Sequence, residues 1–156
     1  MSEHSLQSTT HNPEPKVVVF TCNWQAYSSL EAAGADHTPY PAAIRPLKVM
    51  CLGRLSAGII LKAFEKGADG VLLLGCPPGE CRYEFGNRRA EEVFSEAKEM
   101  AALLGFADEQ LKLDWLASVL ILFWIPTVQE FVAGLEAGTA RKEMVRPPSA
   151  AASKSR

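Results

Sequence analysis

The feature that most constrains the fold is an apolar run at residues 71–74, which ends at Gly75 and is followed by two cysteines. A short run without polar residues is typical of a strand buried on both faces, as in a parallel sheet. The cysteines, Cys76 and Cys81, enclose two prolines that stiffen the segment and a glycine that allows a sharp turn. The sequence therefore predicts a tight loop that presents two thiols at the carboxyl end of a buried strand.

Strand and helix patterns alternate along residues 16–138, which we expect to form a single domain. The expected strands are residues 16–21, 47–52, 71–74 and 111–117, the last nearer a sheet edge, and the expected helices are residues 23–33, 57–66, 87–104 and 126–135. The proline-rich residues 38–46 are expected to be a connecting loop. This alternation favours an α/β fold of the flavodoxin or Rossmann type: a mostly parallel four-stranded sheet with helices on both faces.

Composition and charge restrict the class of protein. Residues 1–15 are polar and predict a disordered tail, and residues 139–156, rich in basic residues, proline and alanine, predict a flexible basic tail. A formal net charge of -2 argues against general nucleic-acid binding. The first fifteen residues lack the apolar core of a signal peptide, and no apolar run approaches the roughly 20 residues that span a bilayer. We therefore expect a cytoplasmic protein.

Two further cysteines, Cys22 and Cys51, lie at the ends of the first two predicted strands. Parallel sheets bind ligands beyond the carboxyl ends of their strands, so all four thiols are expected at one edge of the sheet. In a chain without a secretory signal, grouped cysteines more often indicate metal or redox chemistry than structural disulfides. The candidate cofactor- and metal-binding residues are therefore Cys22, Cys51, Cys76 and Cys81.

Spacing alone leaves three interpretations of these thiols open. Structural zinc sites usually use two close pairs of ligands, whereas here only Cys76 and Cys81 are close in sequence. Iron–sulfur sites tolerate dispersed ligands, and plant-type ferredoxins include a cysteine pair with the same separation. The third interpretation is a structural or thiol-switch interaction module, in which Cys76 and Cys81 form a reversible disulfide while Cys22 and Cys51 are buried small hydrophobes.

Three motifs go beyond spacing: Phe-Thr-Cys-Asn-Trp at residues 20–24, Val-Met-Cys-Leu-Gly-Arg at residues 49–54 and Gly-Cys-Pro-Pro-Gly-Glu-Cys-Arg-Tyr at residues 75–83. Further matching residues are 40–41, 45, 61–71 and 86–87. Together they resemble the delta subunit of methyl-viologen-reducing hydrogenase, a small iron–sulfur protein that acts with heterodisulfide reductase. The resemblance extends over about residues 16–135.

The resemblance implies a non-catalytic electron-transfer subunit of an oxidoreductase complex. It implies a 2Fe–2S cluster whose iron is bound by Cys22, Cys51, Cys76 and Cys81. The implied partners are a hydrogenase or other dehydrogenase and a flavin-containing, heterodisulfide-reductase A-like flavoprotein. In the best-known members of the family, this relay belongs to a flavin-based electron-bifurcating complex of anaerobic metabolism.

The chain departs from the family pattern at three places. Gln25 stands where the family usually has a further cysteine, and Pro77 and Arg82 stand where its loop often has histidine. Residues 119–124 are strongly apolar, where the family tends to have a small polar turn. This segment is either a docking patch for a partner or part of the fourth strand or the helix that follows it.

Overall fold

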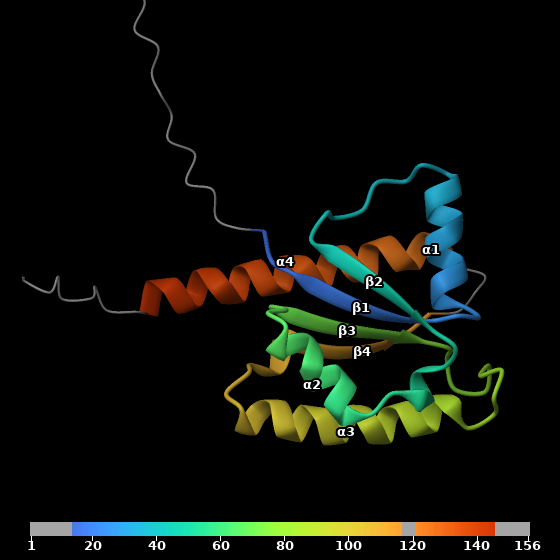
Figure 1. The fold of residues 1–156 in the computed structure, drawn as a ribbon. Coiled ribbons are helices and arrows are strands. Elements are labelled where there is room, and N and C mark those ends of the chain that lie inside the picture. The colour runs from blue at the N-terminus through green and yellow to red at the C-terminus, as the bar shows by residue number, and fades with distance from the viewer. Residues whose placement is uncertain (1–13, 117–120, 146–156) are drawn as a thin grey trace, which may run out of the picture.

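The computed structural model describes residues 14–116 and 121–145 (Figure 1). Its centre is a four-stranded sheet of β1 (Val17–Cys22), β2 (Ile44–Val49), β3 (Gly70–Gly75) and β4 (Leu111–Trp115). All neighbouring strands are parallel, and their order is β2-β1-β3-β4. The carboxyl ends of all four strands therefore meet at one edge of the sheet.

Helices cover both faces of this sheet, as Figure 1 shows. One face carries α1 (Ala26–Ala35) and α4 (Ile121–Val145), and the other carries α2 (Ala57–Glu65) and α3 (Gly86–Leu103). Two short 3-10 helices, η1 (Leu52–Arg54) and η2 (Asp108–Gln110), lie in the connections. The predicted fold class, a single α/β domain with a parallel four-stranded sheet and helices on both sides, is confirmed.

Burial explains why β1 and β3 form the centre of the sheet. Residues 71–74 of β3 have no exposed surface, as expected for a strand without polar side chains. Val17 and Val19 of β1 are equally buried.

The helix α2 begins after Ser56, whose Oγ accepts a hydrogen bond from the backbone N–H of Ile59 at 3.4 Å.

The structure corrects the predicted boundaries of the second strand. The sequence predicts a strand at residues 47–52 after a loop at 38–46, but β2 spans Ile44–Val49. Pro46 lies inside it, which is tolerated because β2 is an edge strand and proline cannot donate to a second neighbour. Cys51 therefore follows the strand instead of ending it. The predicted edge position of β4 is confirmed.

The last helix also differs from its prediction of residues 126–135. Helix α4 spans Ile121–Val145, with Pro126 inside it, so its last seven residues fall within the segment expected to be the basic tail. Of the apolar segment 119–124, residues 121–124 belong to this helix, while 119 and 120 lie outside the described residues. Trp124 is fully buried and Phe123 is 53% exposed, so the segment divides between the core and the surface.

The two expected tails fall mostly outside the described part of the chain, since the structure describes neither residues 1–13 nor residues 146–156. Among the helices that it does describe, none combines the length and the hydropathy needed to cross a bilayer. The structure therefore offers no helical membrane span within its described residues.

Candidate metal centre

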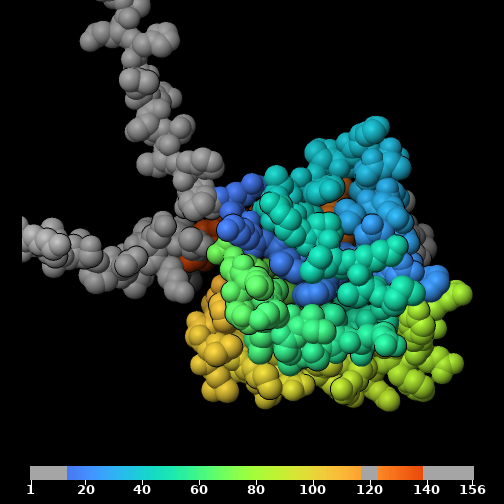
Figure 2. Space-filling model, in the orientation of Figure 1, coloured from blue at the N-terminus to red at the C-terminus, as the bar shows by residue number. Residues whose placement is uncertain are grey.

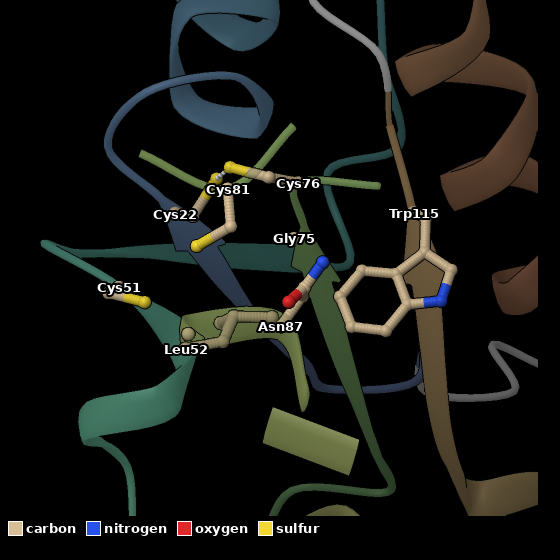
Figure 3. Close-up of a pocket in the computed structure, with 9 residues that line it drawn as sticks. Cys22, Cys51, Leu52, Gly75, Cys76, Cys81, Asn87 and Trp115 are labelled. Carbon is tan, nitrogen blue, oxygen red and sulfur yellow. Dashed lines mark hydrogen bonds between the residues drawn. The ribbon is translucent and has the colours of Figure 1, made fainter. Parts of the chain in front are cut away.

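The four cysteines come together at the carboxyl edge of the sheet (Figure 3). Cys22 is the last residue of β1, Cys76 directly follows β3, and Cys51 lies shortly after β2. Cys81 reaches the same place from the loop between β3 and α3. All four are free thiols, and all four line one pocket. The structure therefore brings every candidate residue to a single location.

Cys22 and Cys76 form an inner pair. Their Sγ atoms lie 3.4 Å apart in a hydrogen bond, and the two side chains are only 2% and 6% exposed. The sheet produces this contact, because β1 and β3 are adjacent and parallel, with Thr21 opposite Leu74. Cys22 is one residue beyond this pair and Cys76 is two residues beyond it, so their side chains meet at the carboxyl edge although 54 positions separate them in the sequence.

Cys51 and Cys81 form an outer pair around the first residue of α3. A Cβ atom built on Gly86 would overlap the Sγ atoms of both cysteines, with 2.8 Å to that of Cys81. Both sulfur atoms therefore lie against the same small volume, which the missing side chain of Gly86 leaves open. Cys81 is half-buried and Cys51 is buried, so the outer pair lies nearer to solvent than the inner pair.

Residues from four other positions complete the pocket: Leu52, Gly75, Asn87 and Trp115. Figure 3 shows the Trp115 ring beside Gly75, and a Cβ atom on Gly75 would lie 2.8 Å from both this ring and Leu52. The amide of Asn87 donates a hydrogen bond to the carbonyl of Pro77 at 3.1 Å, which holds the cysteine loop. Sequence reasoning did not assign these lining residues to the site, although Leu52, Gly75 and Asn87 lie in the segments that carry the family resemblance.

The thiols are arranged as two pairs and not as one quartet. Among the residues described, no group of three or more His, Cys, Asp or Glu side chains has the arrangement needed to hold a single metal ion. The inner pair has a short sulfur–sulfur distance, and the outer pair shares the space at Gly86. A closed tetrahedral zinc site instead has four ligands around one ion.

The inner pair also has unequal proton affinities. The hydrogen bond from Cys76 lowers the pKa of Cys22 from 9.0 to about 6, helped by backbone N–H groups at the start of α1, while burial opposes the shift. The same hydrogen bond, together with burial, raises the pKa of Cys76. The two shifts describe one proton held between two sulfur atoms. Burial raises the pKa of Cys51, with a further contribution from the charge of Cys81.

The loop that carries Cys81 is fastened to the turn after β1. Gln25 donates a hydrogen bond from Nε2 to Glu80 at 3.2 Å, and the indole N–H of Trp24 donates to the Tyr83 hydroxyl at 3.2 Å. The Oε1 atom of Gln25 is buried without a hydrogen-bond partner among the described residues. Gln25, which stands where the family usually has a cysteine, therefore helps to hold the loop that carries Cys81.

Comparison with known proteins decides the family. The model of the family described as methyl-viologen-reducing hydrogenase, delta subunit, matches residues 17–137. The chain belongs to this family. The match includes all four cysteines and every strand of the sheet, so the family accounts for the same domain that the structure shows.

Individual relatives agree with this membership. The chain is 41% identical over 107 residues to the iron–sulfur D subunit of the vhc F420-non-reducing hydrogenase of Methanococcus voltae, which is 69% of this chain and 74% of that protein. It is 31% identical over 134 residues to the iron–sulfur D subunit of the vhu F420-non-reducing hydrogenase of Methanocaldococcus jannaschii, covering 86% and 95% of the two chains.

A different kind of relative contains the same domain within a longer chain. The A subunit of the Ferredoxin:CoB-CoM heterodisulfide reductase of Methanosarcina mazei is 35% identical over 130 residues, which is 83% of this chain. The match spans only 16% of the length of that longer protein. A segment similar to this chain therefore occurs in that organism as part of the heterodisulfide reductase polypeptide.

Proposed function

We propose that this chain is a non-catalytic electron-transfer subunit that binds a 2Fe–2S cluster through Cys22, Cys51, Cys76 and Cys81. The observation that carries the proposal is the convergence of four thiols from three strand ends on one pocket. When bound, such a cluster accepts and releases one electron at a time. The chain itself supplies the ligands, their burial and their hydrogen bonds.

The pairing of the thiols fits a centre with two metal ions. Two thiolates on one tetrahedral ion, with metal–sulfur bonds of about 2.3 Å, lie about 3.8 Å apart. The 3.4 Å between the Cys22 and Cys76 sulfur atoms is within a few tenths of an ångström of that spacing. We assign this inner pair to one iron and the outer pair, Cys51 and Cys81, to the other.

Backbone N–H groups around the thiols would tune the site. The sulfur of Cys22 is within reach of the N–H groups of Trp24, Gln25 and Ala26, at the start of α1. Cys51 has the N–H of Gly53, and Cys76 has that of Arg82. Hydrogen bonds to the ligand sulfurs stabilise negative charge, which favours the reduced form of the centre and raises its potential. The apolar Leu52 and Trp115 limit access of water.

The relatives support a place for this chain in a larger redox complex. We propose as partners a heterodisulfide-reductase A-like flavoprotein and a hydrogenase or other dehydrogenase. The heterodisulfide reductase polypeptide of Methanosarcina mazei supports the first partner, because it contains a similar segment within one chain. The iron–sulfur proteins of the two hydrogenases support the second. Four free thiols suit the reducing cytoplasm, and flavin-based electron bifurcation is the reaction type that we propose for the complex.

Metal analysis and spectroscopy test this function. Protein purified under anaerobic conditions is expected to contain iron and acid-labile sulfide in equal amounts, and to give an electron paramagnetic resonance signal after reduction. Replacing any of the four cysteines with serine should remove most of the iron, whereas the control Met50→Ser, beside Cys51 but exposed, should retain it. Zinc without iron or sulfide in the wild-type protein would refute the proposal.

A second candidate, a thiol switch, is favoured by one observation. The sulfur atoms of Cys22 and Cys76 lie 3.4 Å apart, which makes them a candidate pair in place of Cys76 and Cys81, the pair considered from the sequence. Oxidation of the inner pair to a disulfide would release two protons and two electrons to an oxidant. Thiol counting with and without reductant, together with metal analysis of the protein as isolated, distinguishes this switch, which predicts reversible loss of two thiols and no bound iron.

A further inference from the structure

We propose that the surface around the metal centre is the docking face for an acidic redox-partner protein. This docking rim consists of Trp24, Arg82, Tyr83, Phe85 and Arg88. The inference rests on the proposed electron-transfer function, because it identifies where the partner of that centre binds. Exposure, ring contacts, charge and closeness to the sulfur atoms all support this surface.

The docking rim exposes three aromatic rings at one edge of the molecule. Trp24, Tyr83 and Phe85 are 37%, 45% and 62% exposed. Trp24 and Tyr83 are in contact, with an edge-to-face ring arrangement at 6.5 Å between centroids as well as their hydrogen bond. Figure 2 shows the loop before α3, in yellow-green, projecting beside the blue turn after β1. Exposed aromatic side chains gathered in this way usually mark an interaction site.

Two arginines of the docking rim are held on these rings. The Arg82 guanidinium lies 4.5 Å from the Trp24 ring centroid, and that of Arg88 lies 5.3 Å from the ring centroid of Phe85. Neither guanidinium forms an ion pair with any residue that the structure describes. Tryptophan, tyrosine and arginine are the side chains that most often dominate binding energy at protein interfaces. Stacking also lowers the entropy that these side chains lose on binding.

Charge indicates which kind of partner fits. The five rim residues include two arginines, Arg82 and Arg88, and no carboxylate. The neighbouring Arg89 is paired with Glu92 at 2.8 Å and adds no free charge. The carboxylate of Glu80 accepts the hydrogen bond from Gln25. The rim therefore presents two guanidiniums without an ion pair among the described residues, and a complementary partner presents carboxylates around an apolar contact.

The rim lies directly against the metal centre. The Cβ atom of Tyr83 is 3.9 Å from the point that a Cβ atom on Gly86 would occupy, and this point also touches the sulfur atoms of Cys51 and Cys81. A protein bound to the rim would thus face the outer thiol pair, of which Cys81 is half-buried. This is the position that an electron donor or acceptor of the centre requires.

The test uses the full chain with an amino-terminal affinity tag, isolated anaerobically from its own cells together with its complex. The partner proteins are released with high salt and identified by mass spectrometry and by their flavin or iron content. The binding of these partner proteins to immobilised wild-type chain and to each immobilised variant is then measured, with all chains adjusted to the same iron content. The rim variants are Phe85→Ala and Arg88→Glu, which leave the Trp24–Tyr83 contact intact. The matched controls are Phe123→Ala, an exposed phenylalanine on α4, and Lys66→Glu, an exposed lysine directly after the carboxyl end of α2.

We expect each rim variant to bind the released partner at least about 10-fold more weakly, and each control to bind within about twofold of wild type. The loss for Arg88→Glu should shrink as ionic strength rises. Unchanged binding by both rim variants overturns the docking rim while leaving the cluster proposal standing. Self-association of the chain through the rim in sedimentation experiments also overturns it. If the rim variants bind the partner more weakly and the wild-type chain contains no iron or sulfide, the result supports the docking rim and refutes the cluster.

Discussion

Alanine at position 86 gives the sharpest test of the proposed centre. The substitution Gly86→Ala adds one methyl group at the point where the sulfur atoms of Cys51 and Cys81 meet. Gly86 is the first residue of α3, and its backbone is not in the left-handed region, so alanine is compatible with the local conformation. Any loss therefore comes from the overlap with the two sulfur atoms and not from backbone strain.

The size of the effect follows from the overlap of the new methyl group with the two sulfur atoms. Non-bonded heavy atoms prefer about 3.5–4.0 Å, but the new Cβ atom would lie 2.8 Å from Cys81 Sγ and closer still to Cys51 Sγ. Each overlap costs about 1–3 kcal/mol when the sulfur is held by a metal and cannot rotate away. The gain from alanine in a helix, about 1 kcal/mol or less, is present with and without metal and cancels in the metal affinity. Metal binding should weaken by about 30-fold to more than 10,000-fold.

The measurement is iron and sulfide content after reconstitution, with urea unfolding of the metal-free chain as a parallel readout. Metal-free Gly86→Ala should remain folded, because its free thiols can rotate. The control Gly134→Ala, in α4 with no atom within 4 Å of the new methyl group, should gain up to about 1 kcal/mol of stability and bind iron normally. Full iron binding by Gly86→Ala would show that these two sulfur atoms do not act together.

Three further predictions concern the fold and its protonation. Leu72→Ala removes a fully buried side chain from β3 and should lower the free energy of unfolding by about 2–5 kcal/mol in urea titrations; a loss below about 1 kcal/mol would contradict the central position of that strand. Ser56→Ala removes the amino-terminal cap of α2 and should cost about 1 kcal/mol by the same assay, whereas Ser56→Asp should not. Folding lowers the pKa of Cys22 from 9.0 to about 6, so the free energy of unfolding of the metal-free chain should rise between about pH 6 and pH 9.0, and this gain is absent below about pH 6. Cys22→Ser should reduce the dependence of the unfolding free energy on pH, and an unchanged dependence would disprove the assignment.

The alternation of apolar runs and amphipathic segments was enough to predict the fold, because each strand of a parallel sheet needs a crossover and each crossover here is a helix. The boundaries of β2 could not be predicted, since Pro46 argues for a loop unless the strand is known to be at an edge. Pro126 misled in the same way, because the burial of Trp124 and Val128 favours a helix that continues through it.

The candidate site was predictable only in part. The positions of Cys22 and Cys76 follow from the strand ends, so their meeting could be expected from topology alone. The division into pairs could not, because it depends on how closely α3 approaches the loop at Gly86. The contribution of Trp115 was also out of reach, since it requires knowing that β4 lies beside β3.

The inner thiols are neighbours only when the two central strands are paired, across 54 positions of sequence. No short fragment of the chain can reproduce this contact, so the unfolded chain has no comparable affinity for a ligand that both thiols bind. A ligand that recognises the folded form alone adds RT ln(1 + [L]/Kd) to its stability. Ligand binding and folding are thereby linked equilibria, so a core mutation far from any sulfur lowers the occupancy of the site and a bound ligand stabilises a weakened core.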